Sequence, residues 1–282
     1  MNIYTCNSFA LDESGGNPAG VVLDSPRLND EDYIKIAKTV GFSETAFVFP
    51  SNRADFNVRF FTPVEEVDLC GHATIATFFT LIKTRTIAAG RYTMETKAGI
   101  LDINVAQDQT VFMEQLNPIY YQNINREEIT NSLNISENEL IPDLPTHIVS
   151  TGLKDLIVPL SSPERLNQLN PDFDKIATIS RKYDIVGYHL FAMDDGNIYS
   201  RNFAPALGIN EESATGTASG ALAGYLFKFT NMEIKKDIPL RFYQGFSMNK
   251  KSQIDVHITT ENRQIKQIKV GGNCKNFQKK RF

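Results

Sequence analysis

The pattern of apolar and polar positions along the chain predicts many strands and few helices. Strands are indicated by alternation with a period of two, or by short apolar runs bounded by turn residues. In the first part of the chain these patterns fall at residues 2–10, 46–49, 55–62, 91–96, 100–106 and 110–115. In the second part they fall at residues 146–150, 155–160, 186–193, 197–204, 239–244, 252–260 and 264–270. Residues 117–125 are mostly polar, and we expect an irregular connection there.

Helical patterns are of two kinds. Four amphipathic segments are expected on the surface, at residues 30–40, from about 126, at 163–169 and at 172–182. The first of these has Asn29 as its N-cap and is ended by Gly41. Two other segments, which begin near Gly71 and Gly216, are apolar on all sides. Because a helix without a polar face is buried, each is predicted to be the central helix of a curved sheet.

The two apolar helices are preceded by related sequences, which indicates an internal duplication. Residues 61–63 (Phe-Thr-Pro) correspond to residues 203–205 (Phe-Ala-Pro). Residues 70–73 (Cys-Gly-His-Ala) correspond to residues 215–218 (Thr-Gly-Thr-Ala). The spacing between the two matches is nearly the same in both copies, and each copy carries acidic residues between them.

These patterns together predict an α+β fold of two pseudo-symmetric domains. A chain of 282 residues has room for two domains of ordinary size. Its hydrophobic content of 41%, with 19 Phe and 10 Tyr, supplies two cores. We place the domains at residues 1–118 and 119–282, each a barrel-like curved sheet around its central helix, and leave open that the last segment packs back on the first domain.

Composition excludes several classes of protein. The net charge of −4 and the sequence pI of about 5.7 argue against a nucleic-acid-binding surface. No apolar stretch approaches the roughly 18 residues needed to span a membrane, and the first residues do not resemble a signal peptide. The three cysteines are far apart, so no disulfide framework or metal-binding spacing is indicated, and a cytoplasmic location is expected. The basic tail (Lys275, Lys279, Lys280 and Arg281) is expected to be frayed and solvated.

The turn that begins each apolar helix is a candidate anion-binding site. The first N–H groups of a helix have no partner within it, and the helix dipole places positive charge there. Gly71 and Gly216 permit close approach of a ligand to the backbone. Two such turns predict binding of a carboxylate or phosphate. The alternative is that both glycines serve only the packing of helix against strand.

Three side chains near these turns are candidates for proton transfer. Glu44 lies between Phe42 and an aromatic strand, and we expect partial desolvation, which suits a general acid or base. The alternative is a solvated surface glutamate. His72 stands at a helix start, where its neutral form is favoured as a donor or proton shuttle. Glu212, in the second copy, is a further proton carrier or orienting group.

Cys70 leaves two interpretations open. It could form a thiolate–imidazole pair with His72, but residues two apart in a turn need not come within hydrogen-bonding distance. Cysteine is also among the residues most often buried for packing alone. The duplicate position holds Thr215, which argues against a racemase that uses two thiols on opposite faces of its substrate.

Several motifs, taken together and in order, resemble those of the PhzF family of phenazine-biosynthesis-like proteins. They are Gly16–Ala19 (Gly-Asn-Pro-Ala), Ser43–Phe47, Arg59–Pro63 with Leu69–Thr74, and Phe203–Pro205 with Glu211–Ala218. The resemblance implies a fold similar to diaminopimelate epimerase and proline racemase, and a homodimer. It also implies a cofactor-independent isomerase, since the namesake acts on trans-2,3-dihydro-3-hydroxyanthranilate.

The resemblance assigns roles to particular residues. The family's acid/base glutamate falls on Glu44, and its glycine–histidine pair falls on Gly71 and His72. Its second-domain carboxylate falls on Glu212. The following glycine and hydroxyl fall on Gly216 and Thr217, and Asn17, in the first motif, is expected to bind substrate. The family usually reads Glu-Asp-Pro-Ala-Thr-Gly-Ser where this chain reads Glu-Glu-Ser-Ala-Thr-Gly-Thr, which leaves the shape of the substrate open.

The sequence thus predicts an isomerase that moves a proton, and with it a double bond, within a small carboxylate-bearing substrate. No metal, cofactor, nucleic acid or membrane is expected as a partner. One alternative is a one-thiol racemase or epimerase that uses Cys70 with Glu44. The other is a non-catalytic protein that binds a metabolite or a partner protein.

Overall fold

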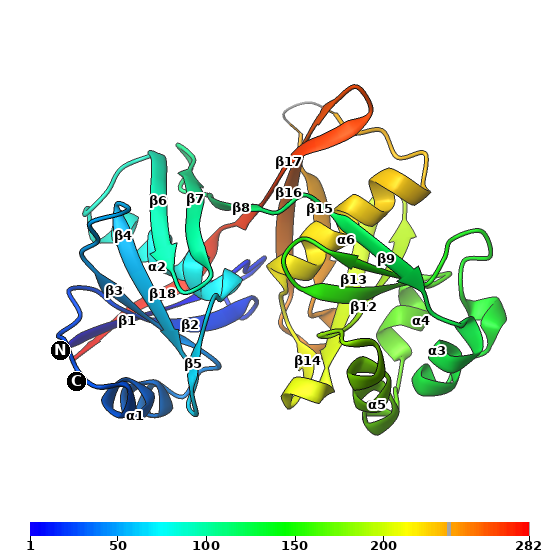
Figure 1. Cartoon of the computed structure of the whole chain (residues 1–282), viewed down its shortest axis with the longest axis horizontal. Coiled ribbons are helices and arrows are strands. Elements are labelled where there is room, and N and C mark those ends of the chain that lie inside the picture. The colour runs from blue at the N-terminus through cyan, green and yellow to red at the C-terminus, as the bar shows by residue number, and fades with distance from the viewer. Residues whose placement is uncertain (236–237, 282) are drawn as a thin grey trace. The chain divides into compact units, whose positions relative to one another are not determined.

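A computed structural model describes residues 1–235 and 238–281 of the chain (Figure 1). The chain divides into two compact units. Unit 1 consists of Met1–Glu114 and Gly271–Phe282, and unit 2 consists of Gln115–Val270. The division falls a few residues before the boundary expected from the sequence, and the last segment of the chain belongs to unit 1.

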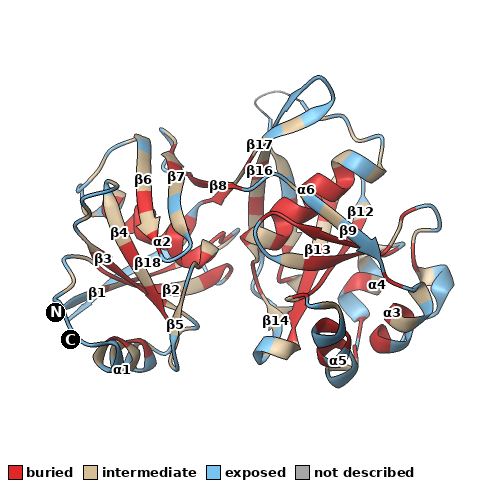
Figure 2. Cartoon of the chain, in the orientation of Figure 1, coloured by how far each residue is buried: buried red, intermediate tan, exposed pale blue. Residues whose placement is uncertain are grey.

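Unit 1 is a curved sheet around one buried helix. Its helices are α1 (Asp30–Val40) and α2 (Gly71–Lys83). Its strands are β1 (Asn2–Ser8), β2 (Asn17–Val22), β3 (Thr45–Phe49), β4 (Phe56–Phe61), β5 (Glu66–Val67), β6 (Gly90–Thr96), β7 (Gly99–Val105) and β18 (Cys274–Arg281), with β8 (Val111–Gln115) crossing the division. Strand β1 pairs with β2 and β18, β2 runs parallel to β3, and β4 pairs with β3, β5 and β6. Helix α2 is buried without a break from His72 to Leu81, as its all-apolar sequence predicts (Figure 2).

Helix α1 covers the face of the unit 1 sheet that is opposite to α2. Tyr33 and Ala37 on this helix pack against Val22, Phe47 and Phe61 from three strands. The expected ends of the helix are confirmed. The side chain of the N-cap Asn29 accepts a hydrogen bond from the backbone N–H of Asp32, and Gly41 ends the helix in the left-handed conformation at φ 78°.

Unit 2 repeats this plan with more helices on its outer face. Its helices are α3 (Arg126–Leu133), α4 (Pro163–Gln168), α5 (Phe173–Tyr183) and α6 (Gly216–Phe229), with short 3-10 turns η1 (Glu137–Glu139), η2 (Pro205–Leu207) and η3 (Phe246–Met248). Its strands are β9 (Ile119–Asn123), β10 (His147–Ser150), β11 (Lys154–Pro159), β12 (Gly187–Asp194), β13 (Asn197–Ala204), β14 (Ile209–Glu212), β15 (Leu240–Gln244) and β16 (Ser252–Glu261), with β17 (Gln264–Gly272) crossing the division. Helix α6 is the buried central helix, and apolar residues of α3, α4 and α5 pack on the opposite face of the sheet.

Each of the two units contains its own arginine–glutamate pair, which the sequence motifs did not reveal. Arg59 on β4 donates two hydrogen bonds to Glu66 on β5, at 2.7 and 2.8 Å. Arg201 on β13 donates two to Glu211 on β14, at 2.8 and 2.7 Å. Each guanidinium also lies over a phenylalanine two residues ahead, at 4.9 Å in unit 1 and 4.8 Å in unit 2. The repetition of a complete bidentate pair with its ring contact supports the predicted internal duplication.

Two expectations about irregular segments are wrong. Residues 117–125 contain strand β9, which pairs antiparallel with β10, instead of an irregular connection. The basic tail is not frayed, because residues Cys274–Arg281 form β18, which pairs with β1 along most of its length. Phe277 on this strand stacks on Tyr4 and meets the ring of Phe79 edge-on. These contacts and the paired backbone hold the lysine-rich segment in the sheet.

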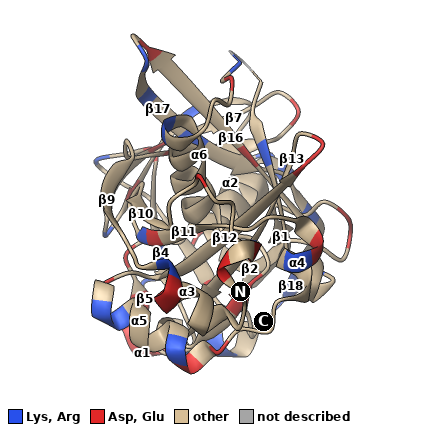
Figure 3. Ribbon diagram, turned by 90° about the vertical axis from the view of Figure 1, so that its right-hand side faces the viewer, with Lys and Arg blue, Asp and Glu red and all other residues tan. Residues whose placement is uncertain are grey.

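Charged residues are distributed without a dominant sign. Lys and Arg are interspersed with Asp and Glu on the ribbon (Figure 3), consistent with the net charge of −4. Among the residues that the structure describes, no helix has both the length and the apolar character needed to cross a membrane.

Candidate active site

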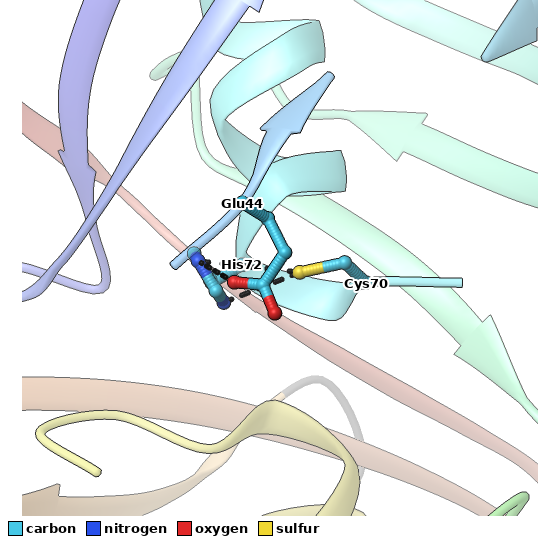
Figure 4. Close-up of side chains that lie close together, drawn as sticks. All are labelled: Glu44, Cys70 and His72. Carbon is cyan, nitrogen blue, oxygen red and sulfur yellow. Dashed lines mark hydrogen bonds and ion pairs between the residues drawn. The ribbon is translucent and has the colours of Figure 1, made fainter. Parts of the chain in front are cut away.

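Glu44, Cys70 and His72 come together in unit 1, where their side chains point toward one another (Figure 4). The carboxylate Oε2 of Glu44 lies 3.2 Å from Nε2 of His72. Sγ of Cys70 lies 3.4 Å from Nδ1 and 4.0 Å from Nε2 of the same ring. The His72 side chain is 6% exposed and that of Glu44 is 15% exposed, so the group is largely shielded from water. The expected partial burial of Glu44 is therefore found, and the solvated alternative is not.

The local backbone explains how these three residues meet. Glu44 stands between the left-handed Gly41 that ends α1 and the first residue of β3. Its carbonyl oxygen accepts a hydrogen bond from the N–H of Gly20 at 3.2 Å, which ties it to the neighbouring parallel strand β2. Cys70 is the N-cap of α2 and has an extended backbone, so its side chain lies beside the first turn that carries His72.

The ring of His72 is held from several sides. Nδ2 of Asn17 lies 3.4 Å from Nδ1, and Oγ of Ser43 lies 3.5 Å from Nε2. The hydroxyl of Ser8 donates a hydrogen bond to the His72 backbone carbonyl at 2.7 Å. Burial lowers the pKa of His72, and the nearby Glu44 carboxylate only partly opposes this effect. The ring is therefore neutral near pH 7, as its position at a helix start suggested.

The two central helices begin differently from the surface helices. Each surface helix has a side chain that caps its first turn, namely Asn29 for α1, Asn125 for α3, Ser162 for α4 and Asp172 for α5. Each of these four also has an acidic residue in its first turn. Neither α2 nor α6 has a side-chain cap or an acidic residue in its first turn. The positive ends of the two central helices, at Gly71 and Gly216, therefore suit an external anion.

In unit 2, Glu212 forms a compact hydrogen-bonded group with Thr215 and Gln244. The hydroxyl of Thr215 donates to Oε2 of Glu212 at 2.6 Å. The buried side-chain amide of Gln244 donates to the Glu212 carbonyl at 2.9 Å and accepts from the Thr215 N–H at 3.1 Å. Thr215 is the counterpart of Cys70, so the position beside the helix start contacts a candidate proton carrier in both units. Thr217 lies half-buried in the first turn of α6, where its carbonyl accepts from the Thr151 hydroxyl at 3.2 Å.

The interior of unit 2 also contains polar residues where unit 1 is apolar. His189 lies opposite Asn202 on β12 and β13, just before Phe203. By the strand registers of the two units, His189 corresponds to Ala46 and Asn202 corresponds to Phe60. Asp155 on β11 corresponds in the same way to Ala19, near the start of β2. All six are nearly or fully buried, so the polar set in unit 2 is not required by the fold itself.

Burial keeps this polar set uncharged. Burial, together with the negative charge of Glu212, raises the pKa of Asp155 to about 8. Burial also lowers the pKa of His189 to about 3, and its Nδ1 lies 3.2 Å from the Asn202 amide nitrogen. Glu212 thus lies near a carboxylic acid that retains its proton at pH 7. The sequence did not reveal Asp155, because the pair Lys154–Asp155 stands at the start of an apolar run, where a solvated strand end is typical.

The raised pKa of Asp155 predicts how stability depends on pH. In the unfolded chain an aspartate titrates near its ordinary value of 3.8, whereas Asp155 in the folded chain titrates at about 8. Between these values only the unfolded state releases the proton, so the free energy of unfolding falls as pH rises from about 4 to about 8. We expect Asp155→Asn to remove this contribution, which amounts to roughly several kcal/mol.

This expectation is tested by urea unfolding of wild type and Asp155→Asn at several pH values across that window. The exposed Asp143 lies in the same unit, and Asp143→Asn is the matched control. The difference in stability between Asp155→Asn and wild type should grow with pH, while the control follows wild type. Parallel profiles for all three proteins would contradict the assignment.

The structure places the residues predicted from sequence in two groups. Asn17, Glu44, Gly71 and His72 lie together in unit 1, with Cys70 among them, and the thiol–imidazole contact left open by the sequence is found. Glu212, Gly216 and Thr217 lie around the start of α6 in unit 2. Sequence reasoning missed Ser8, Ser43, Gln244 and Asp155, which contact or influence these residues.

Comparisons with known proteins agree with this fold. Residues 6–279 match the PhzC-PhzF family, described as phenazine biosynthesis-like protein. An uncharacterized isomerase of Clostridium acetobutylicum is 34% identical over 97% of this chain and 95% of its own length. The crystal structure of a PhzF-family phenazine biosynthesis protein from Bacillus anthracis is 29% identical, with a TM-score of 0.89 over 100% of this chain and 99% of that chain.

A more distant structure shares the fold alone. A probable proline racemase from Agrobacterium radiobacter matches with a TM-score of 0.66, at 10% identity, over 100% of this chain and 92% of that chain. The α+β fold of two duplicated units, predicted from the sequence, is therefore shown. The extent of the match and the identity of the relatives establish that the chain belongs to the PhzF family of phenazine biosynthesis-like proteins.

Proposed function

We propose that the chain is an isomerase that moves a proton between two carbon atoms of a small carboxylate-bearing substrate without a cofactor. The observation that carries this proposal is the shielded Glu44–His72 pair beside the uncapped start of α2. A carboxylate that is partly removed from water and held next to a neutral imidazole is suited to general acid/base catalysis. The name isomerase given to the Clostridium relative supports the same reaction class.

In the proposed reaction, Glu44 removes a proton from one carbon of the substrate. The electron pair of the broken C–H bond forms a new double bond, and the neighbouring double bond shifts. Glu44 then returns its proton to the carbon at the far end, so no atom or electron is gained or lost overall. His72, neutral and held by Asn17 and Ser43, orients the Glu44 carboxylate during both steps.

Within unit 1, we assign binding of the substrate carboxylate to the start of α2, where the N–H groups around Gly71 supply donors and a positive dipole end and Asn17 supplies a side-chain amide. Within unit 2, the start of α6 at Gly216 is proposed as an anion-binding turn of the same kind, with Glu212 and Thr217 as its polar side chains. The substrate class resembles trans-2,3-dihydro-3-hydroxyanthranilate, a cyclic amino acid with a hydroxyl group. Ser213 and Thr217 differ from the proline and serine usual in the family, so the resemblance does not fix the shape of the substrate.

A second candidate is a one-thiol racemase or epimerase. The observation that favours it is the 3.4 Å contact between Sγ of Cys70 and the His72 ring, which could generate a thiolate. We expect Cys70→Ser to retain most of the turnover, because Glu44 is the proposed proton carrier. Loss of turnover of roughly a hundredfold or more in this variant, measured with its substrate bound normally, would favour the thiol mechanism.

The proposal is tested by NMR in D2O with a panel of small cyclic and amino carboxylic acids, including dihydro-hydroxyanthranilate. Wild type, Glu44→Gln and the exposed control Glu65→Gln are compared. Deuterium should enter a carbon position of the substrate with wild type and Glu65→Gln only. Binding of an acid without exchange by wild type would contradict catalysis and favour a metabolite-binding protein.

A further inference from the structure

The side chains of Glu44, Cys70 and His72 offer a carboxylate, a thiol and an imidazole in one small volume. Among the residues that the structure describes, these donor atoms form a group in which all lie within 4.8 Å of one another. Figure 4 shows Glu44, just before the start of β3, and Cys70 and His72, at the start of α2, pointing toward one another. Each of the three donor types is a recognised ligand for Zn²⁺.

The separations are close to those of a tetrahedral metal site. Zinc bonds of about 2.0–2.3 Å place neighbouring ligand atoms roughly 3.3–3.8 Å apart. Nε2 of His72 lies 3.2 Å from Oε2 of Glu44 and 4.0 Å from Sγ of Cys70. One nitrogen atom therefore lies near both other donors, and no two of the three donor atoms are more than 4.8 Å apart.

A second observation concerns the carboxylate of Glu44. Oε2 of Glu44 is fully buried, yet it accepts no hydrogen bond within the described part of the chain, despite its short separation from His72. A buried carboxylate oxygen without a donor is costly, and a bound cation would satisfy it.

We propose that this cluster is a binding site for a thiophilic divalent cation such as Zn²⁺, held by Glu44, Cys70 and His72. The ligand set of thiolate, imidazole and carboxylate selects Zn²⁺ or Co²⁺ over Mg²⁺ and Ca²⁺, which prefer oxygen ligands. Cys70 releases its thiol proton to solvent when the metal–sulfur bond forms, and no electron is transferred. A water molecule or a substrate oxygen completes the fourth position, because three protein ligands leave it open.

The consequence for activity rests on the proposed function. The metal would occupy the carboxylate that carries the proton and the imidazole that orients it. The cation is therefore an inhibitor that excludes proton transfer, and it is not a cofactor of the reaction. Zinc concentration would then set the active fraction of the enzyme, which is a form of regulation available to this chain because it combines Cys70 with Glu44.

The first test needs no substrate. Co²⁺ is added to the full-length, chelator-treated protein, and absorption is followed for a thiolate-to-cobalt charge-transfer band. We expect one Co²⁺ per chain, displacement by Zn²⁺ and no displacement by Mg²⁺. Cys70→Ser should lose the band, and Glu44→Gln should weaken Co²⁺ binding by about tenfold or more.

The chain offers matched controls, because Cys6 and Cys274 are also buried thiols in unit 1. Cys6→Ser and Cys274→Ser should keep the band, and circular dichroism checks that every variant is folded. A band that persists in Cys70→Ser, or wild type that binds neither Co²⁺ nor Zn²⁺, would overturn the site.

The second test separates the site from the proposed function. Zn²⁺ should abolish the deuterium exchange catalysed by wild type, with the same concentration dependence as its binding. If Zn²⁺ binds and exchange continues, inhibition is refuted while the metal site stands. If no acid exchanges with any protein, the proposed function fails, and the cobalt spectrum still decides the metal site.

Discussion

Replacing Glu44 by glutamine is expected to lower kcat by roughly 10²–10⁴-fold while substrate binding stays within a few-fold of wild type. Glutamine has the same shape and keeps the contacts of the side chain, but it cannot accept and return a proton. The neighbouring helix start and Asn17, which are proposed to bind the substrate carboxylate, are unchanged. The measurement is kcat and KM for the acid identified by deuterium exchange, together with its Kd.

The control for this variant comes from the same segment of the chain. Ser43 contacts the His72 ring at 3.5 Å but carries no proton in the proposed reaction. Ser43→Ala should therefore lower kcat by about tenfold or less. Equal losses in Glu44→Gln and Ser43→Ala would indicate that the pocket tolerates no change at all, and full activity of Glu44→Gln would refute the assignment of the proton carrier.

Replacing Arg201 by methionine is expected to destabilise unit 2 by about 3–5 kcal/mol. The Arg201 and Glu211 side chains are only 7% and 13% exposed, so the substitution leaves a carboxylate with little access to water. Arg201 also donates to the backbone carbonyls of Leu166 and Leu169, which lose their partner as well. The loss should appear as a lower urea midpoint in the unfolding of unit 2, followed by circular dichroism.

The duplication supplies the control for this effect. Arg59→Met removes the equivalent guanidinium in unit 1, but Glu66 keeps an ion pair with Lys97 at 2.8 Å. The Arg59 side chain is also 29% exposed, so water replaces part of what is lost. We expect a clearly smaller loss for Arg59→Met. Equal losses for the two variants would mean that burial does not determine the strength of these pairs.

The sequence predicted the helices and strands that are determined by residues within one short segment. Helix α1 is specified by a cap at Asn29, an apolar stripe and Gly41, all within one short segment. Strand β18 could not be recognised in this way, because its partner β1 lies at the opposite end of the chain and half of its own residues are basic. The short strand β14 lies in the acidic segment between the two repeated motifs, and it could not be recognised because its pairing depends on the fold of β13.

The candidate site was predicted in part for the same reason. Glu44, His72 and Glu212 are recognisable because they stand beside motifs that recur or that resemble a family. The contact between Cys70 and His72 depends on the extended backbone of the N-cap, which the sequence does not specify. Asp155 and Gln244 are single polar residues in strands, and their burial beside Glu212 is determined by where the strands lie around α6.

Unit 1 is formed by two separate stretches of the chain, and this has a consequence for its biosynthesis. Unit 2 is one continuous stretch, so all of it has been synthesised before β18 is made. Until then β1 pairs only with β2, and the hydrogen-bonding groups along its other edge have no partner. Strand β1 therefore waits for β18, and unit 1 closes its sheet only after the whole of unit 2 has been synthesised.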